Sequence, residues 1–184
     1  MTPAEEGLIA TMTDPFFPKD AAGDLASSRS LTAKAKTYAA RMRLQATLDQ
    51  ADALEAVREV TANLIGCEEV ALYKVDEAKA VLWLYWSFGI DPNKHFCFDV
   101  MKESRLRDAI AGEIVFRQSR SDDKLLAIDE PVSALVPIRR EGSTVGLLIL
   151  FRLLPQKPGL DPSDREVCEM LSHWGGRAIT PYQV

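Results

Sequence analysis

The sequence has few of the residues that most catalytic and metal-binding sites require. It contains only two histidines, His95 and His173, and three cysteines at wide spacings, Cys67, Cys97 and Cys168. An odd number of distant cysteines argues against a disulfide framework and against a structural zinc site. The two histidines lie far apart in the chain, which makes a catalytic triad hard to build. We therefore expect a protein that is not an enzyme and that carries no metal or cofactor.

An excess of positive charge and a long apolar run are also missing. The net charge is -5, whereas contact with nucleic-acid phosphates calls for a basic surface. The longest apolar stretch, residues 145–151, is far shorter than the roughly 20 residues of a membrane-spanning helix. The first basic residue, Lys19, comes too late for a signal peptide. These features predict a cytoplasmic protein that binds neither nucleic acid nor membrane.

The length of 184 residues suits one domain with an extension. Residues 1–30 contain three prolines, two glycines and a serine-rich patch, and they show no hydrophobic periodicity. Such a composition is typical of a flexible segment. We therefore expect a flexible N-terminal arm over residues 1–30 and a folded domain over residues 31–184.

A long helix is predicted at the start of the folded domain. Residues 31–65 contain no glycine or proline and are rich in strong helix formers. Apolar residues recur at steps of three and four from Leu44 through Leu48 to Leu64, which places them on one helix face. Gly66 follows as a plausible stop. A continuous helix of this length exceeds the sheet that it has to cover, so we expect its first half to project or bend.

Two β-hairpins and a short mixed crossover follow the helix. A polar turn at residues 76–79 separates the strands of the first hairpin, and a turn containing Gly142 separates those of the second. A terminal helix begins at Asp161-Pro162, an N-cap followed by proline at the first helical position. The strands and the crossover helix are predicted at residues 70–75, 80–88, 95–100, 103–111 (helix), 113–117, 132–139 and 144–153. This order predicts an α+β fold: a central antiparallel sheet of five or six strands, with the N-terminal and C-terminal helices on one face and the crossover on the other.

Two segments of the second half carry a family resemblance. Residues 134–150 read ALVPIRREGSTVGLLIL, and residues 160–171 read LDPSDREVCEML. Together they resemble the C-terminal half of GAF domains, in which a Val-Pro-Leu-like strand turns at a glycine and a last helix follows. Pro137 cannot donate a ladder hydrogen bond, and Gly146 lets another chain segment approach closely. The resemblance implies a GAF-like fold and a signalling sensor or adaptor, although such folds host many ligands and partners.

An aromatic cluster in the middle of the chain gives the candidate ligand site. The aromatic residues either form a hydrophobic core or line a pocket under the crossover, where GAF domains bind small molecules. Two arginines could supply the polar anchors of such a pocket. The candidate ligand-binding residues are Trp83, Tyr85, Phe96, Phe98, Arg105 and Arg117.

Other activities of GAF-like proteins find weaker support in the sequence. His95 and Cys97 would face the same side of a strand, but no second pair lies nearby to complete a metal site. They are not adjacent, as a bilin-binding site would require, and haem binding would rest on His95 alone. Reduction of free methionine sulfoxide would need several clustered cysteines, and the Asn93-Lys94 and Phe98-Asp99 pairs are wrongly spaced for cyclic-nucleotide binding. A small enzyme or cofactor carrier on the same fold stays the alternative.

The sequence shows no kinase, cyclase, phosphodiesterase or DNA-binding segment. The signal of such a sensor would pass through a partner protein or through dimerisation. We expect a homodimer built on the long helix and the terminal helix, because part of the long helix has nothing of its own domain to pack on. The apolar residues expected in that interface are Leu31, Tyr38, Met42, Leu44, Val167, Met170 and Trp174.

Overall fold

The computed structural model describes residues 21–78, 80–117 and 124–179. The chain divides into two units, residues 1–32 and residues 33–184. Of the expected N-terminal arm, residues 1–20 lie outside the described residues. Helix α1 (Ala21–Gln45) begins within the remainder of that arm, ahead of the start that we predicted at Leu31.

The helical segment before Gly66 is divided into separate pieces. After α1, a new helix α2 (Gln50–Glu59) begins, and a π-helix (Val60–Ile65) continues it. Gly66 ends the π-helix with a left-handed backbone, φ 75°, as the sequence predicted. The helix predicted over residues 31–65 is thus not continuous: it is interrupted at residues 46–49.

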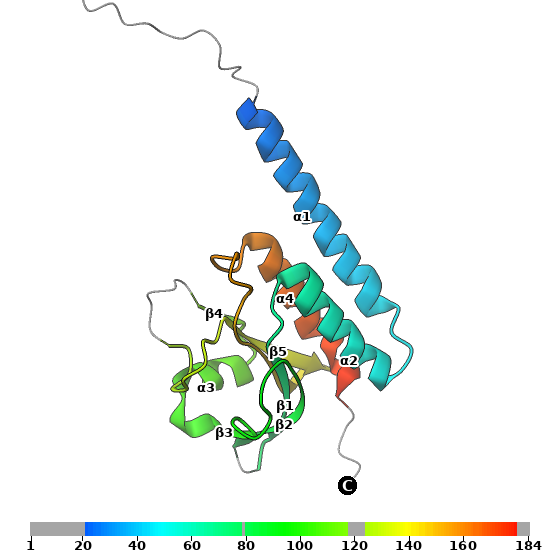
Figure 1. Cartoon of the computed structure of the whole chain (residues 1–184). Helices are drawn as coiled ribbons and strands as arrows, with labels where there is room; N and C mark the ends of the chain where they lie inside the picture. Colours follow the sequence, from blue (N-terminus) through cyan, green and yellow to red (C-terminus); the bar gives the residue numbers. More distant parts are fainter. Residues whose placement is uncertain (1–20, 79, 118–123, 180–184) are drawn as a thin grey trace, which may run out of the picture. The chain divides into compact units, whose positions relative to one another are not determined.

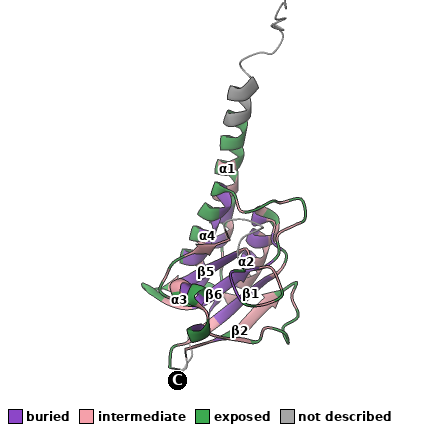
Figure 2. Cartoon of the chain, turned by 90° about the vertical axis from the view of Figure 1, so that its left-hand side faces the viewer, coloured by how far each residue is buried: buried purple, intermediate pink, exposed green. Residues whose placement is uncertain are grey.

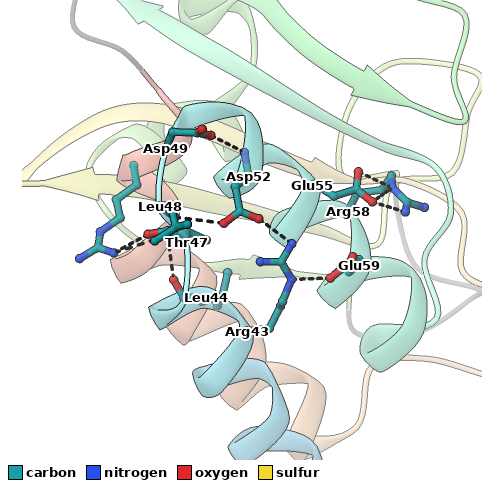
Figure 3. A network of polar contacts seen from close by, with 10 residues as sticks. Arg43, Leu44, Thr47, Leu48, Asp49, Asp52, Glu55, Arg58 and Glu59 are labelled. Carbon is teal, nitrogen blue, oxygen red and sulfur yellow. Dashed lines mark hydrogen bonds and ion pairs between the residues drawn. The ribbon is translucent and has the colours of Figure 1, made fainter.

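Local polar chemistry explains the break. The Asp49 carboxylate accepts a hydrogen bond from the Asp52 amide at 2.8 Å, so Asp49 is the N-cap of α2. Arg43 then holds the two helices together, with Nε 2.5 Å from Glu59 Oε2 and Nη2 2.9 Å from Asp52 Oδ1 (Figure 3). Leu48, which we had placed in the apolar stripe, lies in the connection and is 93% exposed.

The strands form one six-stranded antiparallel sheet in the order β3-β2-β1-β6-β5-β4. Both predicted hairpins are confirmed, β1 with β2 and β5 with β6. The strand bounds are β1 Val70–Asp76, β2 Val81–Phe88, β3 Cys97–Asp99, β4 Val115–Phe116, β5 Ala134–Arg140 and β6 Ser143–Leu150.

Each face of the sheet carries its own apolar core (Figures 1 and 2). On β1, Val70 and Leu72 pack with α1, α2 and the terminal helix α4 (Pro162–Trp174), whereas Ala71 and Tyr73 pack with α3 (Ser104–Ile110) and the crossover. Short 3₁₀ turns lie at Val100–Lys102 and Gly175–Ala178. The predicted α+β fold is confirmed, with N-terminal and C-terminal helices on one face and the crossover on the other.

The start of α4 also follows the sequence. Asp161 is its N-cap, Pro162 follows, and the side chains of Asp161 and Asp164 cap each other's backbone amides in a capping box. No helix of the described residues is both long and apolar enough to span a membrane.

Gly146 lies where two strands and a C-terminal side chain meet. A Cβ atom added at this glycine would lie 2.5 Å from the Tyr73 carbonyl oxygen and would also collide with Ile179 Cδ1. The close approach predicted at Gly146 is therefore confirmed, and it is set by the pairing of β6 with β1.

We predict that Gly146→Ala destabilises the domain, because the paired backbone of β1 cannot move away without losing its ladder. Overpacking of this kind costs about 1–3 kcal/mol, occasionally more. Urea unfolding followed by circular dichroism measures the loss. Gly159→Ala is the control, since nothing lies within 4 Å of the added methyl group. Equal midpoints for the two variants would contradict the prediction.

Candidate functional site

The six predicted ligand-binding residues lie in different parts of the fold. Tyr85 lies on the helix side of the sheet, where its hydroxyl accepts a hydrogen bond from Gln50 and Lys74 Nζ lies 4.0 Å from its ring centroid. Trp83 is 41% exposed, with its ring 6.4 Å from that of Phe96. Phe98 packs on the opposite side of the sheet, its ring 5.2 Å from that of Tyr73.

The space under the crossover is occupied by apolar side chains. Tyr73, Leu106 and Phe151 are fully buried members of this cluster. Arg105 is exposed on α3, and Arg117 is half-buried directly after β4. The six residues thus do not gather around one cavity, and ligand binding under the crossover stays a prediction.

A cavity of about 360 Å³ lies elsewhere, at the start of α4. It is bordered by the residue after β4, the approach to β5, the segment that follows β6 and the first turns of α4. Among the lining residues in the described part of the chain, four are basic and none is acidic, in a chain whose net charge is -5. The lining residues are Arg117, Pro131, Ser133, Arg152, Leu153, Lys157, Pro158, Gly159, Leu160 and Arg165. Of the predicted set, only Arg117 belongs to this cavity.

A fully buried carboxylate lies behind this cavity. Asp164 accepts a hydrogen bond from Lys36 of α1 through Oδ1, and its Oδ2 lies 2.6 Å from Lys157 Nζ. The Lys157 ammonium also donates to the Ile65 carbonyl at the end of the π-helix. Lys157 therefore connects the cavity to α4 and to the end of the π-helix, and through Asp164 to Lys36 of α1.

The neighbouring Asp161 shares the same charges. Burial opposes its ionisation, but hydrogen bonds from the Ser163 hydroxyl and the Asp164 amide and the charges of Lys36 and Lys157 lower its pKa overall. The carboxylates of this cluster are thus matched by cations and N–H or O–H donors, which fixes the first turn of α4 beside the cavity.

Two arginines at the cavity are held by contacts of their own. Arg152 Nε lies 3.5 Å from Glu69 Oε2, and the Arg165 guanidinium lies 4.7 Å from the centre of the Phe116 ring. A cation above an aromatic face at this distance is an attractive interaction that leaves the edge of the guanidinium available. The arrangement can receive an anion without first assembling its cations.

Sequence reasoning missed this cavity because its basic residues come from separate segments. Lys157 and Arg165 lie eight positions apart across a loop and a helix start, and Arg117 comes from the far side of the crossover. No spacing rule connects such residues before the fold is known. The local sequence feature that bears on this cavity is the helix start at Asp161-Pro162, because it places Arg165 in the first turn of α4.

The three cysteines are free thiols in different surroundings. Burial raises the pKa of Cys67 to about 12 and that of Cys168 to about 12. Cys97 is partly exposed on the edge strand β3. Within the described ranges there is no group of three or more His, Cys, Asp or Glu side chains that could hold a metal ion.

Comparisons with solved structures identify the fold. The chain is similar to GAF domains of phosphoenolpyruvate-protein phosphotransferases from Acinetobacter (15% identity, 78% of this chain and 90% of that chain, TM-score 0.60) and Coxiella burnetii (11%, 80% and 92%, 0.61). It is also similar to a free methionine-R-sulfoxide reductase from Thermoplasma acidophilum (15%, 69% and 92%, 0.52). No family model and no curated protein sequence matches the chain.

The class of fold is therefore established. The six-stranded antiparallel sheet with its two layers of helices is a GAF-like fold, as the resemblance in residues 134–171 implied. Solved proteins with this fold include part of a methyl-accepting chemotaxis protein (15% identity, 76% of this chain and 93% of that chain, TM-score 0.55) as well as the reductase. The activity therefore has to be argued from the chain's own residues.

We predict that one thiol of the native protein reacts readily with iodoacetamide at pH 8. The buried thiols of Cys67 and Cys168 stay protonated because their pKa values are about 12, and the thiolate is the reactive form. Mass spectrometry after a short exposure should find a single adduct at Cys97, and all three cysteines should react in urea. Modification of Cys67 or Cys168 at the same rate as Cys97 in the native protein would contradict this.

Proposed function

We propose that the chain is a non-catalytic, cytoplasmic signalling sensor or adaptor that acts through self-association of α1 or through a partner protein. The observation that carries the proposal is that α1 has two different faces, only one of which is used by its own domain. The fold comparisons support this reading, because the chain is also similar in fold to part of a methyl-accepting chemotaxis protein.

One face of α1 packs on the domain. Ala40 and Leu44 are 0% and 2% exposed within the helix-side core, and Lys36 reaches the buried Asp164. Arg43 completes this face through its ion pairs with α2. These contacts hold residues 33–45 of α1 to the helix-side core of the domain.

The other face presents apolar residues to solvent. Tyr38 is 65% exposed and Met42 is 49% exposed, and Ala35 and Gln45 are exposed at the adjoining positions. Ala35, Tyr38 and Met42 follow spacings of three and four, which is the a/d spacing of a coiled coil, and the polar Gln45 follows three positions further on. Exposed apolar side chains in this pattern favour a second copy of the same helix, because two-fold association is the commonest oligomer.

The structure narrows the interface that the sequence suggested. Leu44 and Val167 are buried in their own domain, so they cannot serve a dimer contact. Met170 and Trp174 also pack against the helix-side core. The proposed interface therefore lies on α1 and does not need the terminal helix.

A small enzyme on the same fold is the second candidate. The observation in its favour is the structural similarity to the Thermoplasma reductase. The cysteines of this chain give it little support, because Cys67 and Cys168 are buried and only Cys97 is partly exposed. Incubation with free methionine sulfoxide and a thiol reductant should therefore yield no methionine above the level of a Cys97→Ser control.

We predict that the protein is dimeric in light scattering at micromolar concentration and that Tyr38→Glu with Met42→Glu converts it to a monomer. Charges at these positions would face each other across the helix pair. Met101→Glu, which changes a methionine that is 63% exposed outside α1, is the control and should leave the dimer intact.

Circular dichroism verifies that each variant stays folded. A wild-type protein that remains monomeric at high concentration would rule out self-association and leave a partner protein as the route of the signal. Dissociation of the Met101→Glu control to the same extent would show that the effect does not arise on α1.

A further inference from the structure

The described residues that line the basic cavity at the start of α4 include none of α1. Arg117, Arg152, Lys157 and Arg165 all line a volume of about 360 Å³. Glu69 beside Arg152 and Asp164 beside Lys157 reduce the repulsion among these four cations, but Asp164 is shared with Lys36, so repulsion remains. An acidic chain has no need to collect such cations for solubility. A bound anion would remove this repulsion, which is an electrostatic reason to expect one.

The remaining lining residues give the cavity a mixed character. Its apolar walls are formed by Leu153, Leu160, Pro131 and Pro158. The Ser133 hydroxyl donates a hydrogen bond of 2.6 Å to the Phe151 carbonyl. The volume lies at the lower end of the range of about 300–1,000 Å³ that is typical of small-molecule sites. It suits a compact molecule rather than a nucleotide chain or a peptide.

We infer that this cavity binds a small multivalent oxyanion with a short carbon skeleton, a phosphorylated or polycarboxylate metabolite. Arginine presents a planar fork of N–H donors that matches phosphate and carboxylate oxygens. The apolar walls receive the carbon skeleton, and the arginines on either side receive the charged groups. The site is separate from the space under the crossover, which is occupied by the apolar cluster around Tyr73 and Phe151.

Lys157 gives this site a route to α1, and this part of the inference rests on the proposed function. Its ammonium is shared between the cavity and Asp164, the carboxylate that also binds Lys36. An anion in the cavity competes with Asp164 for the Lys157 ammonium. When Lys157 binds the anion, the ion pair between Asp164 and Lys36 becomes stronger. Occupancy should therefore tighten the hold of the domain on residues 33–45 of α1.

The binding test uses isothermal titration calorimetry of the full chain with two probes, inorganic pyrophosphate and citrate. Arg152→Gln with Arg165→Gln removes two charges at exposed positions of the cavity, and we expect affinity for the preferred probe to fall at least tenfold. Arg105→Gln with Arg140→Gln removes the same charge outside the cavity, and we expect less than a twofold change. Tighter binding of pyrophosphate would indicate a phosphorylated ligand, and tighter binding of citrate a polycarboxylate.

Three results would overturn the site. The first is that neither probe binds at low ionic strength. The second is that both double variants lose the same affinity. The third is that only the double variant Arg105→Gln with Arg140→Gln loses affinity. The last would place the ligand under the crossover. Thermal unfolding of each variant verifies that the fold is intact, because Arg152 and Arg165 are exposed and their loss should shift the midpoint little.

Hydrogen exchange tests the route to α1 separately. Saturation with the preferred probe should slow amide exchange in residues 33–45, and Lys157→Met should abolish that slowing. Binding without any change in α1 would overturn the coupling and leave the anion site in place. A wild-type protein that stays monomeric in the light-scattering experiment above but binds the anion normally would instead overturn self-association alone.

Discussion

The arrangement of the helix layer depends on one buried carboxylate. Asp164 is fully buried, and its two oxygens are bound by Lys36 from α1 and Lys157 from the segment before α4. An ionised side chain in such a place is tolerated only when its charge is matched and its oxygens are hydrogen-bonded. Here the Asp161 amide adds a hydrogen bond of 2.8 Å, so the capping box of α4 and the two ion pairs satisfy the same group. The position of α4, the end of the π-helix and the attachment of residues 33–45 are therefore set together.

This shared group connects the two proposals. Residues 33–45 are held on one face by Asp164 and the apolar core, which leaves Tyr38 and Met42 available for a second copy of the chain. On the other side of Asp164, Lys157 lines the basic cavity. A change of charge in the cavity and a change in the attachment of α1 thus act on the same carboxylate. Under the proposed function, an anion in the cavity would interact differently with the two states of α1, and such a difference is what lets a ligand shift the balance between them.

Much of the fold could be predicted because its signals are local. The polar turn at residues 76–79 and the turn containing Gly142 predicted the two hairpins, and Asp161-Pro162 predicted the start of α4. The break in the N-terminal helix was missed because Leu48 fits a three-and-four spacing, whereas Asp49 as an N-cap decides the backbone. The basic cavity could not be predicted, because Arg117 and Arg165 are brought together only by the packing of α4 beside the sheet. Proximity in the sequence placed Trp83, Tyr85 and Phe98 in one candidate site, yet the sheet places Tyr85 and Phe98 on opposite faces.

A double-mutant cycle between Lys36 and Asp164 tests the central claim most directly. Lys36→Met, Asp164→Asn and the double variant are unfolded in urea beside the wild type, and the exposed pair Glu55 and Arg58 serves as the reference cycle. We expect Asp164→Asn to cost about 3–5 kcal/mol, as loss of one partner of a buried ion pair does. The coupling energy of Lys36 with Asp164 should reach about 1–3 kcal/mol, against about 0.2–1 kcal/mol for an exposed pair. Additive effects of Lys36→Met and Asp164→Asn would contradict the claim that this carboxylate ties α1 to the domain.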